Sequence, residues 1–268
     1  MHRLVIAISL LCLTFSGTAT AGVVVTSTQT RLSDHRSMPV TIYIETDRMK
    51  VTLPGMVVIY RGDLNRIWAA DLRRQVYYEL TPETMRQFTG LTAQLSAAQA
   101  QLHDTLAQLA PEQRAQIESL LGGIAVPPAA RNNSTTPVFA KLGSSKTVAG
   151  HGCDLYRKSL KGQQQADFCI APAASAGLEA SDFGVLDRFS DFAAPVMASN
   201  LVPHLDDMDW GAVNRAIGYT GIPLDVIAYD RGKPDMQQTV TNIERMPIAA
   251  GMFELPAGLN RQDLTGLH

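Results

Sequence analysis

Two cysteines on either side of a glycine-containing break constrain the fold of this chain more than any other feature. The stretch from Thr147 to Cys169, TVAGHGCDLYRKSLKGQQQADFC, has two extended runs separated at Leu160–Gly162, which is typical of a β-hairpin. If the turn is centred on Lys161, Cys153 lies directly opposite Cys169, and directly opposed Cβ atoms are roughly 4.5–5.5 Å apart. A small adjustment brings such a pair to disulfide geometry. The sequence therefore predicts a Cys153–Cys169 disulfide.

Three other interpretations of these cysteines stay open at this point. They could be two reduced, buried thiols, or they could form a zinc site together with His151, although no second ligand pair lies nearby. They could also be a redox pair, but redox-active cysteines usually occur as C-x-x-C near a helix N-terminus. The disulfide is the favoured interpretation because a cross-strand pair holds two strands in register.

The first residues are typical of a secretory signal peptide. They combine a basic start, an apolar run over Leu4–Phe15 and small residues at Ala19 and Ala21, which predicts a signal at 1–21 with cleavage after Ala21. A transmembrane anchor is the alternative, but a spanning helix needs about 20 apolar residues. The remaining cysteine, Cys12, leaves with the signal. Cys153 and Cys169 then stay in an oxidising compartment, where disulfides persist, so we expect a periplasmic or secreted protein.

Residues 22–80 have a β pattern throughout. In PVTIYIETDRMKVTL, for example, apolar Val40, Ile42 and Ile44 alternate with more polar residues, and this period of two gives a strand one buried face and one wet face. Breaks at Leu53–Met56 and Arg61–Asp63 indicate turns. The segment is predicted to be an antiparallel meander.

The period changes after Leu80. Thr81 is a candidate N-cap and Pro82 a first helical residue, and apolar residues then recur every three or four positions. A second helical run begins at Pro111, so we expect a long helix or a helical hairpin over 81–123, followed by a linker over 124–137. The favoured role of this arm is to pack on the concave face of the sheet. The alternatives are a mobile lid or a docking surface for another protein.

Strands and helices alternate again over residues 138–260. β structure runs through the disulfide hairpin, and a helical stretch follows in which Phe183, Leu186 and Phe189 recur every three residues. Two further strands are predicted, joined by a hairpin loop over 230–234. Strands before and after a helical block indicate a single α+β domain over 22–268, with one sheet assembled from both ends of the chain.

Composition and motifs argue against several functions. The formal net charge of −2 and the pI near 6.3 give no basic footprint for nucleic acid. No second long apolar run follows the signal, so no transmembrane segment is expected in the mature chain. HLDDMDW, with His204, Asp206, Asp207 and Asp209, could serve a metal-dependent hydrolase, but a solvated segment is favoured. Because no G-x-S-x-G context is present either, no catalytic residue, metal site or cofactor is predicted.

The order of several short motifs resembles a known family. IYIETDRMKV, DLRRQVYYEL, PEQRAQIESLL, TVAGHGCDLYR, FCIAP and GMFELPAGL follow one another as in a secreted bacterial family catalogued as domain of unknown function 4412. The resemblance covers about Val23 to Leu259. Members of that family are similar in architecture to the periplasmic lipoprotein carriers LolA and LolB. The resemblance implies a half-barrel, a strongly curved antiparallel sheet around an apolar cavity, and it supplies no catalytic residues.

These observations together predict a soluble periplasmic, non-enzymatic protein that binds an apolar or amphiphilic molecule, such as a lipid or a lipoprotein acyl chain. The half-barrel would exchange helix side chains for ligand chains at similar apolar area, about 0.8 kcal/mol per buried CH₂. The residues expected to line the cavity are Ile42, Ile44, Val58, Tyr60, Trp68, Phe88 and Leu95. Each could equally be ordinary core. The alternative function is an envelope structural or protein-interaction module without a cavity, in which the long helix docks a partner protein.

Overall fold

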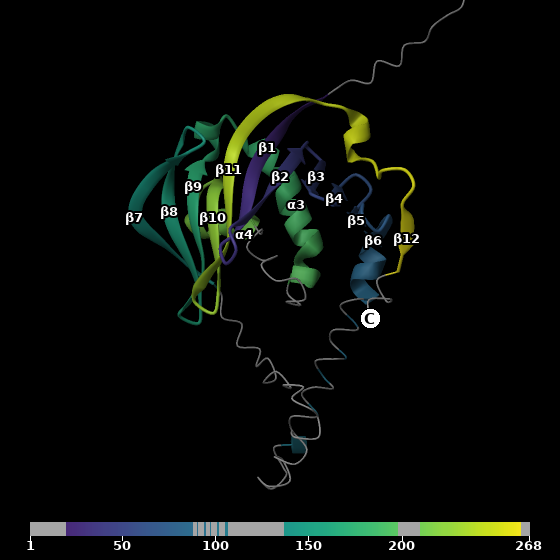
Figure 1. Cartoon of the computed structure of the whole chain (residues 1–268), viewed down its shortest axis with the longest axis horizontal. Helices are drawn as coiled ribbons and strands as arrows, with labels where there is room; N and C mark the ends of the chain where they lie inside the picture. The colour runs from purple at the N-terminus through teal and green to yellow at the C-terminus, as the bar shows by residue number, and fades with distance from the viewer. Residues whose placement is uncertain are drawn as a thin grey trace, which may run out of the picture.

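The protein is built on one open sheet of twelve strands, antiparallel except at one edge (Figure 1). The computed structural model describes residues 20–87, 90, 94, 97, 101, 105–106, 137–197 and 210–263. Along the sheet the strands follow the order β12-β6-β5-β4-β3-β2-β1-β11-β10-β9-β8-β7. An α+β fold around a large antiparallel sheet is therefore confirmed.

The first six strands form the predicted meander. They are β1 Thr20–Arg31, β2 Arg36–Ile44, β3 Arg48–Leu53, β4 Met56–Arg61, β5 Arg66–Asp71 and β6 Val76–Leu80. A tight turn divides the run PVTIYIETDRMKVTL into β2 and β3. The backbone N–H of Glu45 donates to the carbonyl oxygen of Arg48 at 2.9 Å and closes this turn.

The remaining strands complete the sheet from the C-terminal half. They are β7 Val138–Val148, β8 His151–Leu160, β9 Gln163–Pro172, β10 Gly221–Asp230, β11 Lys233–Ile248 and β12 Asn260–Gln262. β1 pairs with β2 on one side and with β11 on the other, which confirms a sheet assembled from both ends of the chain. The short β12 adds in parallel to β6 and was not predicted.

The disulfide hairpin is present, but its register differs from the prediction. The turn is Lys161–Gly162, and both residues have positive φ, at 53° and 78°, as a two-residue type I′ turn requires. A bulge between Lys158 and Ser159 shifts the register further, so that Leu155 is the residue opposite Cys169. The turn that we centred on Lys161 was thus wrong by two residues, because it assumed a longer turn and an unbroken ladder.

The last hairpin is also tighter than predicted. Asp230 pairs with Lys233, so the turn is Arg231–Gly232 and not the five-residue loop over 230–234. Both turn residues have positive φ, at 50° and 76°. The register of the β10–β11 ladder also shifts between Ala228 and Tyr229.

The helix after β6 begins as predicted. The backbone N–H of Thr84 donates to Thr81 Oγ1 at 3.3 Å, and the backbone N–H of Thr81 donates to Thr84 Oγ1 at 2.7 Å, so Thr81 is an N-cap in a reciprocal pair. Residues 82–87 are helical, and Met85 is buried. Most of the predicted arm over 81–123, and the predicted linker up to residue 136, lie outside the described residues.

Among the described residues, a different helix covers the apolar face of β1–β5. This is α3, Ala180–Met197, which carries the predicted apolar repeat. Figure 1 shows α3 within the arc of the strands. Phe183, Val185 and Leu186 are buried in one cluster with residues of these strands, such as Ile42 and Tyr60. The covering helix among the described residues therefore comes from the C-terminal half of the chain. The packing that we predicted for the arm over 81–123 falls mostly outside the described residues.

Three shorter helical segments complete the described fold. They are η1 Ala173–Ala176, α4 Trp210–Ile217 and η3 Ala250–Phe253. Val213 of α4 packs with Tyr156, Phe168 and Ile170 of β8 and β9. The segment MFELP begins inside η3, and Phe253 there is fully buried.

The sheet bends strongly at the β7 end. Some Cα atoms of β7 and β11 approach within 8 Å of each other, although three strands separate them in the sheet order. A flat sheet with strands about 4.8 Å apart would keep them much farther away. Within the described residues, no helix is long and apolar enough to cross a membrane.

Candidate functional site

The residues predicted to line a cavity divide between the two faces of the sheet. Ile42, Ile44 and Tyr60 belong to the buried cluster on the α3 side, and Val58 packs against that cluster. Trp68 lies on the opposite face, since it pairs with Ile59 and is buried with Ile59 and Phe253. Phe88 and Leu95 lie outside the described residues. One cavity on the α3 side can thus include four of the seven residues but not Trp68.

An aromatic contact joins the sheet to α3. The ring of Tyr60 on β4 meets the ring of Phe189 edge-on, with centroids 5.6 Å apart, and lies 6.0 Å from the ring of Phe192. Edge-to-face pairs at this distance are favourable because the ring quadrupoles are complementary. Burial raises the pKa of the Tyr60 phenol, the positive charge of Arg188 opposes this effect, and the negative charge of Asp191 adds to it. Tyr60 therefore stays neutral near pH 7.

Several apolar side chains of the strands and of α3 on this face are incompletely covered. Leu53, Val58, Leu80, Phe189 and Phe192 pack against the core cluster but are only partly buried. Met56 is paired with Leu53 across the β3–β4 turn and is 49% exposed. We call these six residues the apolar patch. Sequence analysis identified Val58 as a site residue, and the other five were missed because their partial exposure depends on how distant segments pack together.

The opposite face near Trp68 is closed by charged groups. Trp68 Nε1 donates to Glu79 Oε1 at 3.2 Å, and the same oxygen accepts from Arg66 at 2.7 Å. The Arg66 guanidinium lies over the Trp68 ring at 5.8 Å, and Arg261 of β12 pairs with Glu79 Oε2 at 2.9 Å. Trp68 is thus part of a structural network that fixes β12 to the sheet edge.

The disulfide predicted from the sequence is present. Cys153 and Cys169 are bonded, and their Cα atoms lie 5.2 Å apart. Both residues are buried, at the end of the ladder between β8 and β9. Cys153 lies opposite Lys146 in the ladder between β7 and β8. The disulfide therefore joins β9 to the β7–β8 hairpin at the end of the sheet.

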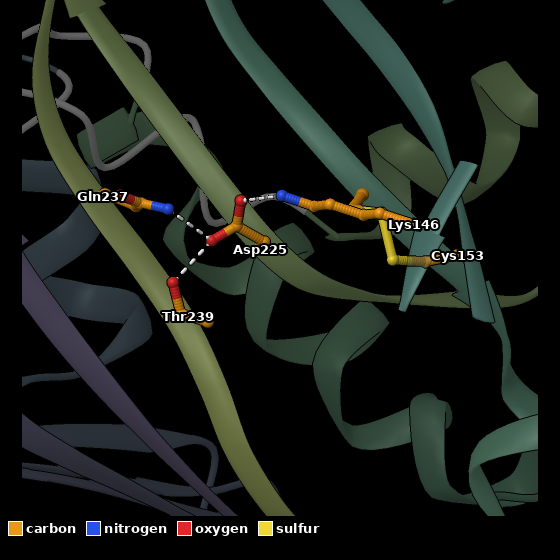
Figure 2. Close-up of a disulfide and its surroundings, with 6 residues drawn as sticks. Lys146, Cys153, Asp225, Gln237 and Thr239 are labelled. Atoms are coloured by element: carbon orange, nitrogen blue, oxygen red, sulfur yellow. Dashed lines mark hydrogen bonds and ion pairs between the residues drawn. A yellow bond between two sulfur atoms is a disulfide. The ribbon is translucent and has the colours of Figure 1, made fainter. Parts of the chain in front are cut away.

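A buried carboxylate lies beside the disulfide, as Figure 2 shows. Asp225 on β10 is 3% exposed and lies directly opposite Cys169. Its Oδ2 accepts from Lys146 Nζ at 2.6 Å, and its Oδ1 accepts from Thr239 Oγ1 at 2.5 Å and from Gln237 Nε2 at 2.9 Å. The Lys146 contact spans from β7 to β10 and is made possible by the bend of the sheet. Sequence analysis missed this network, although an acid in the middle of the apolar strand GIPLDVIAYD, at Asp225, was a signal for it.

A second polar group lies on β8 to β10. Arg157 donates two hydrogen bonds to the carboxylate of the directly opposite Asp167, at 2.8 and 3.0 Å. Asp167 Oδ2 also accepts from the Tyr229 hydroxyl at 3.1 Å and from Gln164 Nε2 at 2.9 Å. Hydrogen bonding to Asp167 raises the pKa of Arg157, and burial raises the pKa of Tyr229. Like Asp225, this carboxylate is saturated by donors and is arranged for stability.

The described part of the chain contains no group of three or more His, Cys, Asp or Glu side chains that could hold a metal ion. The segment with His204, Asp206, Asp207 and Asp209 lies outside the described residues. The hypothesis of a metal-dependent hydrolase is therefore untested.

Comparisons with known proteins give little further information. No model of a protein family matches the chain, and no curated protein matches its sequence. A solved structure of PNGF-II is 7% identical over 91% of this chain and 31% of that chain, with a TM-score of 0.37. A structure of the Pseudomonas aeruginosa MucA/MucB complex is 11% identical over 90% of this chain and 58% of that chain, with a TM-score of 0.39. The chain thus spans less than two thirds of either protein, and similarities of this size do not establish a shared function.

Proposed function

We propose that this chain is an exported, non-enzymatic protein that binds an acyl chain or another amphiphile on the α3 side of its sheet. The observation that carries the proposal is the apolar patch next to the Tyr60–Phe189 contact, where apolar side chains of β3, β4, β6 and α3 are incompletely covered. Contiguous exposed apolar surface often marks a binding site. The proposal agrees with the resemblance to secreted half-barrel carriers.

Export is supported by the disulfide and by the residues before it. A disulfide in a buried position indicates an oxidising compartment, and residues 1–21 have the pattern of a cleaved signal. A non-enzymatic role is supported by the two polar groups centred on Asp225 and Asp167, since hydrogen-bond donors engage both carboxylates. Because donors already occupy both oxygens of each carboxylate, neither is positioned to take a proton from a substrate.

Two matched methionines allow a direct test. Met56 belongs to the apolar patch and is 49% exposed, whereas Met246 lies opposite Gly22 on the other face and is 42% exposed. We expect Met56→Gln to weaken uptake of an apolar fluorescent probe several-fold, because the patch loses apolar area. Met246→Gln should leave uptake unchanged. Equal effects of the two variants, or no uptake by the unmodified protein, would contradict the proposal.

The ligand itself can be sought in protein purified from the periplasm. Native mass spectrometry before and after organic extraction should show a mass loss that corresponds to a co-purified amphiphile. An unchanged mass, together with no probe uptake, would leave the interaction module as the better account.

A specific observation favours that second candidate, an envelope protein-interaction module. β7 lies at the end of the sheet, and apart from β8 it has no strand partner among the described residues. It is exposed over most of its length, with Val138 65% exposed. An unpaired strand edge can accept an extended segment of another protein. A co-purifying protein that protects the β7 backbone amides from hydrogen exchange would support this function.

A further inference from the structure

The residue that follows the predicted cleavage site lies in the interior of the protein. Gly22 is buried, whereas Ala21 just before it is exposed. A Cβ atom at Gly22 would lie 2.6 Å from the carbonyl oxygen of Ile44 and 2.5 Å from Cδ1 of Ile248. Both contacts are shorter than carbon side chains tolerate, so only glycine fits here. The first residue of the processed chain is thus closely packed.

A buried acid with an unsatisfied oxygen lies directly beside this glycine. The side chain of Glu45 is 3% exposed, and its Cγ would be 3.1 Å from a Cβ at Gly22. Glu45 Oε2 accepts from Arg48 at 2.6 Å, but Oε1 is buried and has no hydrogen-bond partner. Leaving a buried charged acceptor without a donor is costly. A donor is therefore expected at Oε1 in the functional form of the protein.

Cleavage after Ala21 would create such a donor. In the uncut chain the Gly22 nitrogen is an amide with one N–H, whereas after cleavage it is an ammonium group with three N–H donors and a positive charge. A cation next to a buried carboxylate forms a strong, charge-assisted hydrogen bond. Other charged groups of this region are Asp47 and Arg48 of the 45–48 turn, Arg61 and Asp63 of β4 and the turn after it, Glu254 after η3, and Arg188 of α3, whose guanidinium donates to the carbonyl oxygen of Thr46.

We propose that removal of residues 1–21 generates a buried ion pair between the new α-ammonium group of Gly22 and Oε1 of Glu45. The inference rests on the export proposed above and adds a consequence of it: the processed protein gains an interaction that the uncut chain cannot form. Processing and stability are then coupled, because the first residue of the processed chain gains a charged contact in addition to the pairing of β1 with β11 that the uncut chain already has.

Four proteins with defined N-termini test the proposal without reference to ligand binding. Chains that begin at Gly22 or at Ala21 are prepared, each with the natural Glu45 and with Glu45→Gln. An Ala21 start restores the amide at Gly22 and moves the ammonium group one residue outward. We expect the melting temperature of the Gly22 start, taken relative to that of the Ala21 start, to be about 2–4 °C higher with Glu45 than with Glu45→Gln. The loss of the short Ala21 pairing affects both backgrounds equally and therefore cancels.

Titration of the Gly22 amine provides a second measurement. An α-amino group ordinarily has a pKa of about 8, and the ion pair should raise it by at least about one unit in the Glu45 protein only. Since the raised pKa belongs to the folded state, the added stability is full below pH 8 and disappears as the pH rises through the folded-state value. An ordinary pKa, or the same melting difference in both backgrounds, would overturn the ion pair. Periplasmic protein whose first residue is not Gly22 would overturn the processing step.

Discussion

Asp225 and Cys169 face each other directly in the ladder between β9 and β10, so the buried carboxylate and the disulfide lie on one face of the sheet. Lys146 of β7 donates to the same carboxylate. In the ladder between β7 and β8, Lys146 lies opposite Cys153. The covalent bond and the ion pair thus close the same curved group of strands (Figure 2). This arrangement explains how the sheet keeps its bend at the β7 end.

Removing the Asp225 carboxylate should destabilise the protein. Asp225→Ala leaves three donors without their acceptor, and we expect a loss of about 2–3 kcal/mol of unfolding free energy in urea, below the full value for a buried pair because Lys146 is 40% exposed. Asp230→Ala is the control, since its side chain is 63% exposed and 3.9 Å from Arg231. The control should change stability by less than about 0.5 kcal/mol. Similar losses in the two variants would contradict the role of Asp225.

Reduction of the disulfide should have an effect of comparable size. The two cysteines are separated by 16 positions, and closing a loop of this length stabilises a fold by about 3 kcal/mol in the chain-entropy model. Urea unfolding with and without a reductant measures this difference. Thiol titration of the denatured, non-reduced protein should detect neither Cys153 nor Cys169. Two free thiols in that experiment would contradict both the bond and the proposed export.

Tyr60 should make stability depend on alkaline pH. Burial raises its pKa in the folded state, and Asp191 adds to the effect while Arg188 opposes it. A raised folded-state pKa gives stability that is full below the unfolded value of about 10 and is lost as the pH rises through the folded value. The free energies of unfolding of the natural protein and of Tyr60→Phe, measured against pH, should therefore diverge above pH 10. The natural protein should lose more stability than the variant. Parallel curves would show that the phenol is not responsible.

The turn of the disulfide hairpin depends on Gly162. Its φ is 78°, and a Cβ there would meet nothing within 4 Å, so Gly162→Ala introduces backbone strain without a steric clash. We expect a loss of about 1–2 kcal/mol. Gly251→Ala is the matched control, because it also has open space but no positive φ. Gly251→Ala should leave the free energy of unfolding nearly unchanged in the same assay.

Local patterns predicted the elements of this fold well. The alternation around Ile42 gave the meander, the Thr81–Pro82 pair gave the start of a helix, and the repeat of Phe183, Leu186 and Phe189 gave α3. These features depend on residues close together in the chain, so their physical cause can be seen in the sequence. The disulfide pair was found for the same reason, whereas its register was not, because the bulge near Ser159 has no clear local signal.

The candidate site was harder to predict because it combines distant segments. Trp68 and Tyr60 are both large aromatic residues of neighbouring strands, and only the pairing of Trp68 with Ile59 shows that they point to opposite faces. Likewise, no local pattern indicates that Phe189 would meet Tyr60. The contact depends on how α3, far along the chain, packs on the sheet.

The sequence by itself determined the β-rich architecture, the cysteine pair and the expectation of export, because hydrophobic period, turn residues and leader composition act over short distances. Tertiary structure alone decided that α3 covers the sheet, that Lys146 meets Asp225 across two strands, and that Gly22 lies against Glu45. These contacts depend on the bend and order of the whole sheet, which arise from the summed packing of residues far apart in the chain.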